Sequence, residues 1–318
     1  MATWWAVRIL LLVNPFSSSV TPRGRVVIQK TLSADHDVTV AETSRRGHAT
    51  RMARGATTDG TDVVVVLGGD GTLNEAANGL AGSACALAPL PGGSTNVFAR
   101  TLGLPDDPVD ATVVLLESLA AGRIEPAGLG VVNGRYFLFH VGIGYDAAVV
   151  EQVERRAQLK RWAGHPLFIY AAFDTWLRRY DRSRPRLAVH HADGAIVDDG
   201  YFTIVANTNP YTFLGTRPFE VAPEATLDRG LVAVTIRTMR AVPFLTVIGG
   251  ALMGGGRVAR SKRVDYRTDL SELTVQGYGP VPYQVDGDFL GEIDELRFRH
   301  EPDAIRLVLP DPDGSDPD

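Results

Sequence analysis

Short apolar runs alternate with longer amphipathic segments over the first 120 residues of the chain. Runs with the length and β-branched content of strands occupy 8–13, 37–42, 62–67 and 86–89. Apolar side chains recur at helical spacing over 24–35, 48–59, 72–79, 96–102 and 109–120. The run at 62–67 shows no polar alternation beyond its first residue, as expected for a strand that is covered on both faces. Strands and helices in this order predict an α/β domain with a mostly parallel sheet.

From residue 123 the pattern changes to short alternating segments separated by Gly, Pro, Asn and Asp. Segments of this kind, which are typical of antiparallel strands, lie at 136–141, 186–190, 201–206, 231–237 and 272–275. One long helical insert is predicted between the first two of them, over 147–180. The change of texture predicts a second domain, an antiparallel β-sandwich.

We therefore expect a two-domain, α/β plus β protein. The first domain is placed at 1–124 and the second at 125–296, and the segment 297–310 is expected to pack back on the first domain. The tail at 311–318 is rich in Pro, Asp and Gly, so we expect it to be disordered.

Composition excludes several classes of protein. The chain has 318 residues, of which 45% are apolar and 22% are charged, the balance of a soluble globular protein. A formal net charge of −5 gives no overall attraction to nucleic acid, so no nucleic-acid partner is expected. The single cysteine, Cys85, lies among small residues and is expected to be a buried, unreactive thiol. Without a run of about 20 apolar residues or a signal peptide, we expect a cytoplasmic protein whose contact with lipid is peripheral.

Turns rich in glycine or asparagine follow three of the four predicted strands. Asn14-Pro15 follows the first strand, Gly68-Gly69-Asp70-Gly71-Thr72 follows the third, and Pro-Gly-Gly-Ser-Thr-Asn at 91–96 follows the fourth. Loops at the carboxyl ends of parallel strands converge on one crevice, and glycines let backbone N–H groups approach an anion. The three turns together predict a phosphate-binding site. For residues 68–72 alone, a tight strand-to-helix turn with an incidental aspartate is the alternative.

The turn after the second strand joins the same rim. It contains Thr43 and then Arg45-Arg46-Gly47-His48, where an arginine either binds phosphate or forms part of a solvated surface pair. The chain has no G-x-x-x-x-G-K-[ST] motif, which excludes a P-loop. It also has no G-x-G-x-x-G at a strand-to-helix turn, which counts against a Rossmann cofactor site.

Together these motifs resemble the diacylglycerol kinase catalytic family, in particular its soluble bacterial lipid kinases. The resemblance rests on Leu-Val-Asn-Pro at 12–15, Gly-Gly-Asp-Gly-Thr-x-Asn-Glu at 68–75 and Pro-Gly-Gly-Ser-Thr-Asn-Val-Phe-Ala-Arg at 91–100. Further matching segments lie, in the family's order, at 139–147, 205–207, 222–230 and 284–288. The resemblance implies an α/β nucleotide-binding domain, a β-sandwich and an active site in the cleft between them. NAD kinases and phosphofructokinases share a similar glycine loop, so that loop alone indicates a superfamily.

The resemblance also implies roles for individual residues. Asp70 would bind Mg²⁺ directly or through water, and Asp286 matches the family's proposed general base, although spacing alone favours a hairpin turn residue. Asp288 stands where the family usually has Glu, and a shorter carboxylate can still serve magnesium through water. The ATP site would be completed by Asn14, Thr43, Gly69, Gly71, Thr72, Glu75, Ser94 and Asn96.

Two positions depart from the family pattern. Asp228-Arg229-Gly230 replaces Asp-Asp-Gly, a turn where some members bind a structural Mg²⁺, which leaves Asp228 as a candidate metal ligand. His140 stands where the family often has Asn, and we interpret it as a strand residue rather than as a catalytic base. The insert at 151–186 mixes cations with large aromatic residues, which suits contact with anionic lipid or, equally, a helix with a solvated basic face.

The leading hypothesis is an ATP- and Mg²⁺-dependent lipid kinase, peripheral to the inner face of the membrane, that phosphorylates the hydroxyl of diacylglycerol to give phosphatidic acid. Phosphorylation of a sphingoid base or another lipid alcohol is the first alternative. A nucleotide-binding regulator without turnover is the second, because the substitutions at Arg229 and Asp288 leave it open. Acyl-chain preference and oligomeric state, a homodimer included, are not set by the sequence.

Overall fold

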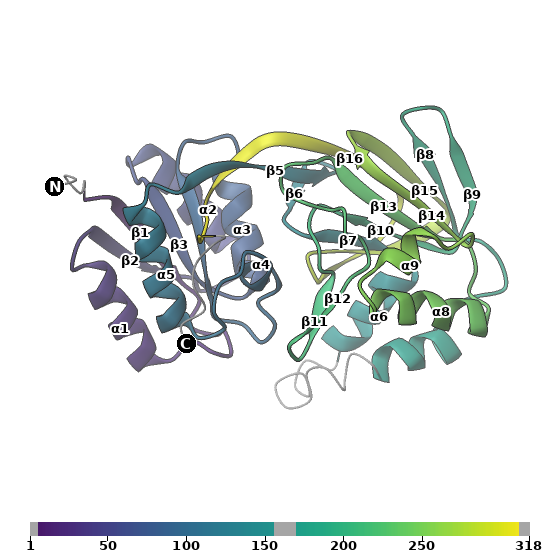
Figure 1. Cartoon of the computed structure of the whole chain (residues 1–318), viewed down its shortest axis with the longest axis horizontal. Helices are drawn as coiled ribbons and strands as arrows, with labels where there is room; N and C mark the ends of the chain where they lie inside the picture. Colours follow the sequence, from purple (N-terminus) through teal and green to yellow (C-terminus); the bar gives the residue numbers. More distant parts are fainter. Residues whose placement is uncertain (1–5, 156–169, 312–318) are drawn as a thin grey trace. The chain divides into compact units, whose positions relative to one another are not determined.

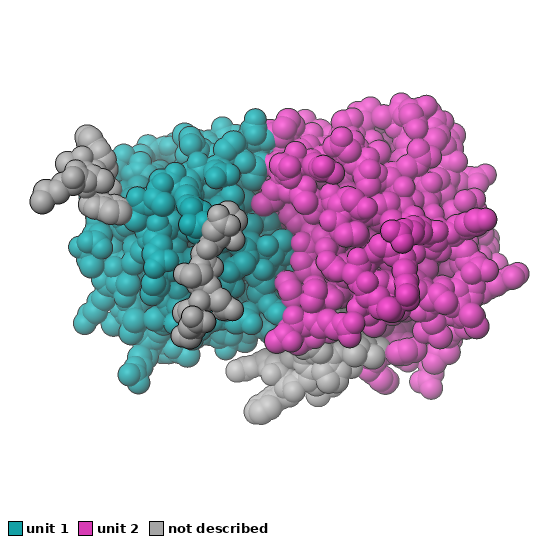
Figure 2. Space-filling view, viewed as in Figure 1, with its two compact units in different colours: residues 1–127, 303–318 teal, residues 128–302 magenta. Residues whose placement is uncertain are grey.

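The computed structural model of the chain describes residues 6–155 and 170–311 (Figure 1). The chain divides into two compact units, which Figure 2 colours separately. Unit 1 comprises residues 1–127 and 303–318, and unit 2 comprises residues 128–302. The two-domain α/β plus β-sandwich-like architecture that the sequence predicts is confirmed. The tail at 312–318 lies outside the described residues, so the expectation of disorder there is untested.

Unit 1 is built on a parallel sheet whose strands follow the order β2-β1-β3-β4, with the end of β16 paired in parallel to β4. Every residue of β3 and β4 is buried, as expected for central strands. Helix α1 packs against α5, and α2 packs against α3. The strands are β1 (Arg8–Val13), β2 (Asp37–Glu42), β3 (Val63–Gly68) and β4 (Ala86–Pro91). The helices are α1 (Pro22–Leu32), α2 (His48–Thr58), α3 (Asp70–Leu80), α4 (Val97–Thr101) and α5 (Pro108–Ala120).

Local capping explains where two of these helices begin. The side chain of Thr21 accepts a hydrogen bond from Gly24 N at the start of α1, and Asp107 accepts from Val109 N at the start of α5. A proline follows each cap, at the first helical position, where its missing N–H is not needed.

Unit 2 is built on an antiparallel sheet in the order β14-β13-β10-β7-β15-β16, with β8 and β9 continuing from β15 and with β5 paired to β6. Its strands are β5 (Ile124–Val132), β6 (Arg135–Phe137), β7 (His140–Ile143), β8 (Leu187–His191), β9 (Ile196–Gly200), β10 (Phe202–Ala206), β11 (Thr212–Leu214), β12 (Arg217–Phe219), β13 (Leu231–Ile236), β14 (Val264–Leu270), β15 (Glu272–Val285) and β16 (Asp288–Val308). Its helices are α6 (Tyr145–Glu154), η1 (Thr175–Arg179), α8 (Ala241–Ala251) and α9 (Gly256–Ala259).

Both faces of this sheet are covered by apolar contacts. Along β13, Val232 and Val234 pack in a cluster with side chains of α6 and α8, whereas Leu231 and Ala233 pack in a second cluster. The alternation follows from the two-residue period of a strand. The sequence pattern does not predict α8 or α9. The predicted helical insert at 147–180 is described only as α6 and, from residue 170, the segment that contains η1, since 156–169 lie outside the described residues.

None of the helices in the described ranges combines the length and the apolar content that a bilayer crossing requires.

Candidate active site

The turns at the carboxyl ends of β1, β2 and β3 are joined to one another by hydrogen bonds. Asn14 N donates to Leu67 O over 3.0 Å, and Asn14 Nδ2 donates to Thr72 Oγ1 over 2.8 Å. Thr43, at the end of β2, is buried and donates its N–H to Val13 O over 2.9 Å. The structure therefore brings together three of the residues that the sequence assigns to nucleotide binding.

The two glycine turns after β3 and β4 lie backbone against backbone. Gly92 N donates to Gly68 O over 3.0 Å, and a Cβ atom added to Gly92 would lie 2.8 Å from Gly68 N. A Cβ added to Gly93 would lie 2.9 Å from Gly69 Cα. Side chains at these positions would push the turns apart, so glycine is required here by close approach.

Asn96 fixes the second of these turns. Its side-chain oxygen accepts from Gly93 N over 2.7 Å, and its own backbone has a φ of 49°, in the left-handed region that asparagine tolerates. Ser94, two residues earlier, is exposed. Both residues thus belong to the turn where the sequence places them.

Asp70 connects the two turns through its carboxylate. One oxygen accepts from Val97 N over 3.0 Å and the other accepts from Phe98 N over 3.1 Å. These N–H groups begin α4, so Asp70 caps that helix from the first turn of α3. Within the described ranges no three or more His, Cys, Asp or Glu side chains gather as they would around a metal ion.

Glu75 plays a similar part for α2. Its two carboxylate oxygens accept from Gly47 N over 2.8 Å and from Ala49 N over 3.2 Å, at the start of that helix. A negative charge is favourable at a helix N-terminus, so these contacts attach α2 to α3. Helix α3 itself begins after Gly69, which has no side chain to cap it. Its first turn, with Gly71 and Thr72, is a position suited to a phosphate.

Asp286 lies in unit 2, in the two-residue turn between β15 and β16. The φ angles of Asp286 and Gly287 are 49° and 81°, the pattern of a tight Asp-Gly hairpin turn. The Asp286 side chain is buried and accepts hydrogen bonds from three consecutive backbone N–H groups, those of Leu138 (2.7 Å), Phe139 (3.0 Å) and His140 (3.1 Å). These bonds hold the carboxylate in one orientation.

A second buried carboxylate, that of Asp146, is connected to this turn through hydrogen bonds. Asp146 accepts from Tyr211 Oη over 2.7 Å and from Gln284 Nε2 over 2.9 Å, while Gln284 Oε1 accepts from Gly287 N over 2.8 Å. A Cβ atom at Gly142 would lie 1.5 Å from Asp146 Oδ2, so only glycine leaves room for this carboxylate. Burial raises the pKa of Asp146 above its ordinary value.

His140 completes this buried group. Its ring stacks on Tyr211 with 4.1 Å between the ring centroids, and burial lowers the pKa of His140 to about 3. The imidazole is therefore neutral at ordinary pH, as expected for a strand residue. Sequence reasoning did not select Asp146, Tyr211 or Gln284. A signal was present for Asp146 and Gln284, each of which is a polar residue between apolar or aromatic neighbours, but not for Tyr211.

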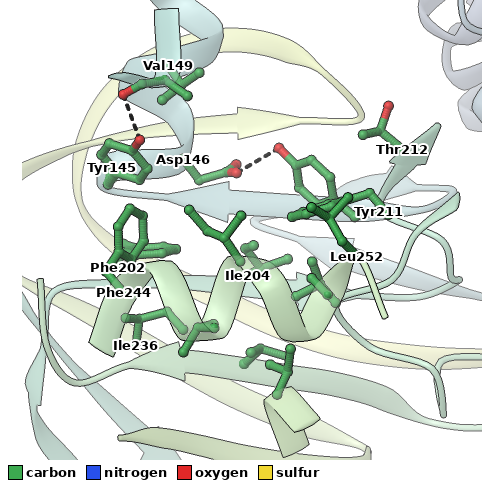
Figure 3. A pocket seen from close by; sticks show the side chains of 18 of the residues that line it. Tyr145, Asp146, Val149, Phe202, Ile204, Tyr211, Thr212, Ile236, Phe244 and Leu252 are labelled. Atoms are coloured by element: carbon green, nitrogen blue, oxygen red, sulfur yellow. Dashed lines mark hydrogen bonds between the residues drawn. The ribbon is translucent and has the colours of Figure 1, made fainter. Parts of the chain in front are cut away.

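Asp146 also forms part of the wall of an apolar cavity of about 320 Å³ in unit 2 (Figure 3). The cavity lies between α6, the sheet and α8, and Asp146 is the one acidic residue among the described residues that line it. Figure 3 shows the hydrogen bond between Asp146 and Tyr211. It also shows Phe202, Ile204 and Phe244, which line the same cavity. The sequence pattern gave no indication of this cavity, because its lining comes from segments far apart along the chain.

The two remaining candidate residues also lie in unit 2. Asp288 is the first residue of β16 and pairs with Val285 across the hairpin. Asp228 lies on an exposed turn, where a hydrogen bond from the Thr226 side chain is the main cause that lowers its pKa. The metal-binding roles of Asp70 and Asp228 stay predictions.

Two protein families match the chain, one after the other. The diacylglycerol kinase catalytic domain matches residues 8–132, and the YegS C-terminal NAD kinase beta sandwich-like domain matches residues 140–309.

Individual proteins match over most of the length. A YegS-like lipid kinase from Pseudomonas aeruginosa is 31% identical over 310 residues, which cover 95% of this chain and 94% of that protein. A diacylglycerol kinase from Bacillus subtilis is 36% identical over 43% of this chain and 46% of its own length. A crystal structure of a protein named as a diacylglycerol kinase, from Bacillus anthracis, covers 96% of this chain and 98% of its own with a TM-score of 0.75. At 22% identity, that last similarity supports the fold alone.

Proposed function

Because the chain belongs to the lipid kinase family that joins a diacylglycerol kinase catalytic domain to a YegS-type C-terminal domain, we propose that it transfers the γ-phosphate of ATP to the hydroxyl of diacylglycerol, giving phosphatidic acid. The observation that carries this proposal is the cavity in unit 2. Its volume of about 320 Å³ and its lining of aliphatic and aromatic side chains suit acyl chains, which gain free energy when they leave water.

The polar wall of the cavity favours a neutral lipid over a sphingoid base. A sphingoid base carries an ammonium group, which needs a free carboxylate as its partner when it is withdrawn from water. The carboxyl of Asp146 bonds to Tyr211 and Gln284 inside the protein, and burial raises its pKa, which disfavours the ionised form that an ammonium group would need as its partner. Diacylglycerol brings no charge to the site.

ATP use follows from membership in a kinase family, and unit 1 offers residues that suit its phosphates. The turns after β3 and β4 consist of glycine where they touch, so phosphate oxygens can approach their backbone N–H groups. The N-terminus of α3 adds a favourable dipole, and the Thr72 hydroxyl and the Asn14 amide lie beside it. Mg²⁺, when bound, neutralises charge on the phosphates. Asp70, whose carboxylate lies between the first turns of α3 and α4, would hold it through its oxygen atoms.

In this proposal Asp286 removes the proton from the lipid hydroxyl. Three backbone N–H groups hold the carboxylate in place, and its position sets where the acceptor hydroxyl must lie. Asp286 would therefore orient the hydroxyl as well as accept its proton. Asp288, two residues along the hairpin, would act with it on the phosphate side.

The test is transfer of radiolabel from [γ-³²P]ATP to a panel of acceptors in mixed micelles: diacylglycerol, sphingosine, ceramide, monoacylglycerol and soluble NAD. We expect label in phosphatidic acid. Label in NAD alone would exclude the lipid kinase, and label in sphingosine alone would exclude diacylglycerol as the acceptor.

The matched variant is Asp286→Asn. An amide can accept fewer of the three backbone hydrogen bonds, so this variant is expected to lose some stability as well as activity. The assay is therefore run at a temperature where circular dichroism shows the variant to be folded. Full turnover in the folded variant would exclude Asp286 as the base.

A further inference from the structure

Large apolar side chains are exposed in one part of unit 2 more than anywhere else in the described chain. Six of the twelve exposed large apolar residues come from two short segments, 170–177 and 242–253. Val242, in the first turn of α8, is 74% exposed, and Leu177, in η1, is 58% exposed. The other four are Tyr170, Phe173, Leu245 and Met253.

The two segments form one surface, because they pack against each other beneath these side chains. The ring of Trp176 stacks on that of Phe244, with 6.2 Å between centroids and planes 6° apart. Phe173 and Leu245, both exposed, also line the apolar cavity. The exposed apolar surface therefore continues into the opening of the cavity.

The sequence of α8 explains why this surface is apolar although it is exposed to solvent. Ala241–Ala251 reads AVPFLTVIGGA and contains no charged residue, although Val242, Leu245 and Thr246 face solvent. A helix on the surface of a globular domain normally turns a polar face to water. Here the helix is apolar on its exposed side as well as on its buried side, where Phe244 and Ala251 lie.

The charged residues in the sequence segment that contains this helix are all of one sign, and Glu220, from a distant segment, contacts only its C-terminal end. Residues 237–263 contain six Arg or Lys and no Asp or Glu, in a chain whose formal net charge is −5. Arg240 precedes α8, and Arg257, Arg260 and Lys262 follow it on exposed positions. An apolar face bordered by cations is the pattern of a helix that lies in the interface of an anionic membrane.

We propose that Phe173, Leu177, Val242, Leu245 and Met253, with the bordering cations, form a docking surface for a bilayer that contains anionic lipid. The proposal rests on the lipid kinase function proposed above, to which it adds a route: acyl chains pass from the bilayer into the cavity without crossing water. Association of two copies through this surface is disfavoured, since it would bring the same cations together.

The test is binding of the full-length protein to vesicles, measured by flotation. Vesicles of phosphatidylcholine with about 30% phosphatidylglycerol, which gives them a negative surface potential, are compared with vesicles of pure phosphatidylcholine. We expect tighter binding to the anionic vesicles. The test variant is Leu177→Glu with Val242→Glu, two residues that do not belong to the cavity lining. The matched control is Phe16→Glu with Ile196→Glu, which places two charges on equally exposed apolar residues outside the docking surface.

The test variant is expected to lose at least about tenfold in partition to anionic vesicles, while the control stays within about twofold of the wild type. Turnover of a short-chain diacylglycerol dissolved below its micelle concentration should survive in the test variant, whereas turnover of vesicle-borne diacylglycerol should fall. Vesicle binding that is equal in the test variant and the wild type overturns the docking surface. The proposal is also overturned if analytical ultracentrifugation shows a dimer for the wild type and a monomer for the test variant while their vesicle binding is the same.

Failure of the proposed function gives a different result. In that case the wild type binds anionic vesicles and the test variant does not, yet no lipid in the panel acquires label.

Discussion

The buried group around His140 is held together by contacts that depend on the absence of charge. The imidazole stacks on Tyr211, its Nδ1 has no hydrogen-bond partner among the residues that the structure describes, and its backbone N–H donates to Asp286. Protonation would place an unpaired cation in this interior, which explains the lowered pKa of His140. The same residue therefore connects the orientation of Asp286 with solution pH.

We predict that His140 makes the protein less stable in acid. The pKa of His140 is about 3 in the folded protein and about 6.5 when unfolded, so between these values the unfolded chain binds a proton that the folded chain does not. Stability is present above the unfolded pKa and is lost as the pH falls. From pH 7 to pH 5 the loss attributable to His140 is about 2 kcal/mol.

His140→Phe tests this, because phenylalanine can keep the stack on Tyr211 but cannot titrate. The free energy of urea unfolding is measured for both proteins at pH 7 and pH 5, and the difference between proteins isolates His140. Asp146, whose raised pKa acts in the opposite direction, is present in both and cancels in that difference. Equal losses in both proteins would show that His140 is not the group responsible.

At the scale of elements, helices α2 and α4 are both capped by carboxylates that α3 supplies. We predict that Glu75→Ala costs about 1–2 kcal/mol, because Gly47 N and Ala49 N lose their acceptor. Faster amide hydrogen exchange in the first turn of α2 should accompany the loss. Glu117→Ala, on the exposed side of α5, is the matched control and should change little.

The same variant examines the role that the sequence assigns to Glu75. If Glu75 serves α2 alone, the dissociation constant for ADP, measured by calorimetry, should stay within about twofold of the wild type. A tenfold weaker affinity with unchanged exchange in α2 would place Glu75 at the nucleotide instead.

The contact between the two glycine turns gives a second prediction at this scale. In Gly92→Ala the new Cβ meets Gly68 N at 2.8 Å and Val20 Cγ2 at 2.9 Å, so the turns must separate. We expect ADP affinity to fall at least about tenfold. Gly55→Ala is the control, because no atom of the described residues lies within 4 Å of its Cβ, and the helix propensity of alanine should raise the stability of α2 by about 0.5–1 kcal/mol. Equal ADP affinities in both variants would show that the contact does not shape the site.

An element can be predicted from the sequence when the residues that determine it lie within its own segment. Strands such as β3 and helices such as α5 lie within two residues of their predicted ends, since apolar runs and a Pro-preceding cap define them. Helix α8 escapes prediction because it is apolar all round and contains Pro243 and two glycines. The capping of α4 by Asp70 escapes it as well, because that contact depends on tertiary placement of residues 27 positions apart.

On the scale of the whole molecule, the candidate site follows the same rule. The residues of the glycine turns are predicted because each follows its own strand, and parallel strands bring such turns together. The cavity is not predicted, since α6, β10, β13 and α8 line it jointly and none of them indicates a void alone. The turns proposed to bind the nucleotide and the cavity proposed to bind the acceptor thus lie in different units, each with its own core.

This division predicts that a substitution in the cavity can change the preference for the lipid acceptor without changing the binding of ATP. Ala172 is half-buried and lines the cavity, so Ala172→Phe adds volume where acyl chains are proposed to lie. We expect KM to rise at least about tenfold for long-chain diacylglycerol and much less for short-chain diacylglycerol, with KM for ATP within about twofold of the wild type. Phosphate transfer to diacylglycerols of increasing chain length, at saturating ATP, measures both. A variant with the chain-length profile of the wild type would place the acyl chains elsewhere, whereas an equal loss at every chain length would indicate a damaged fold.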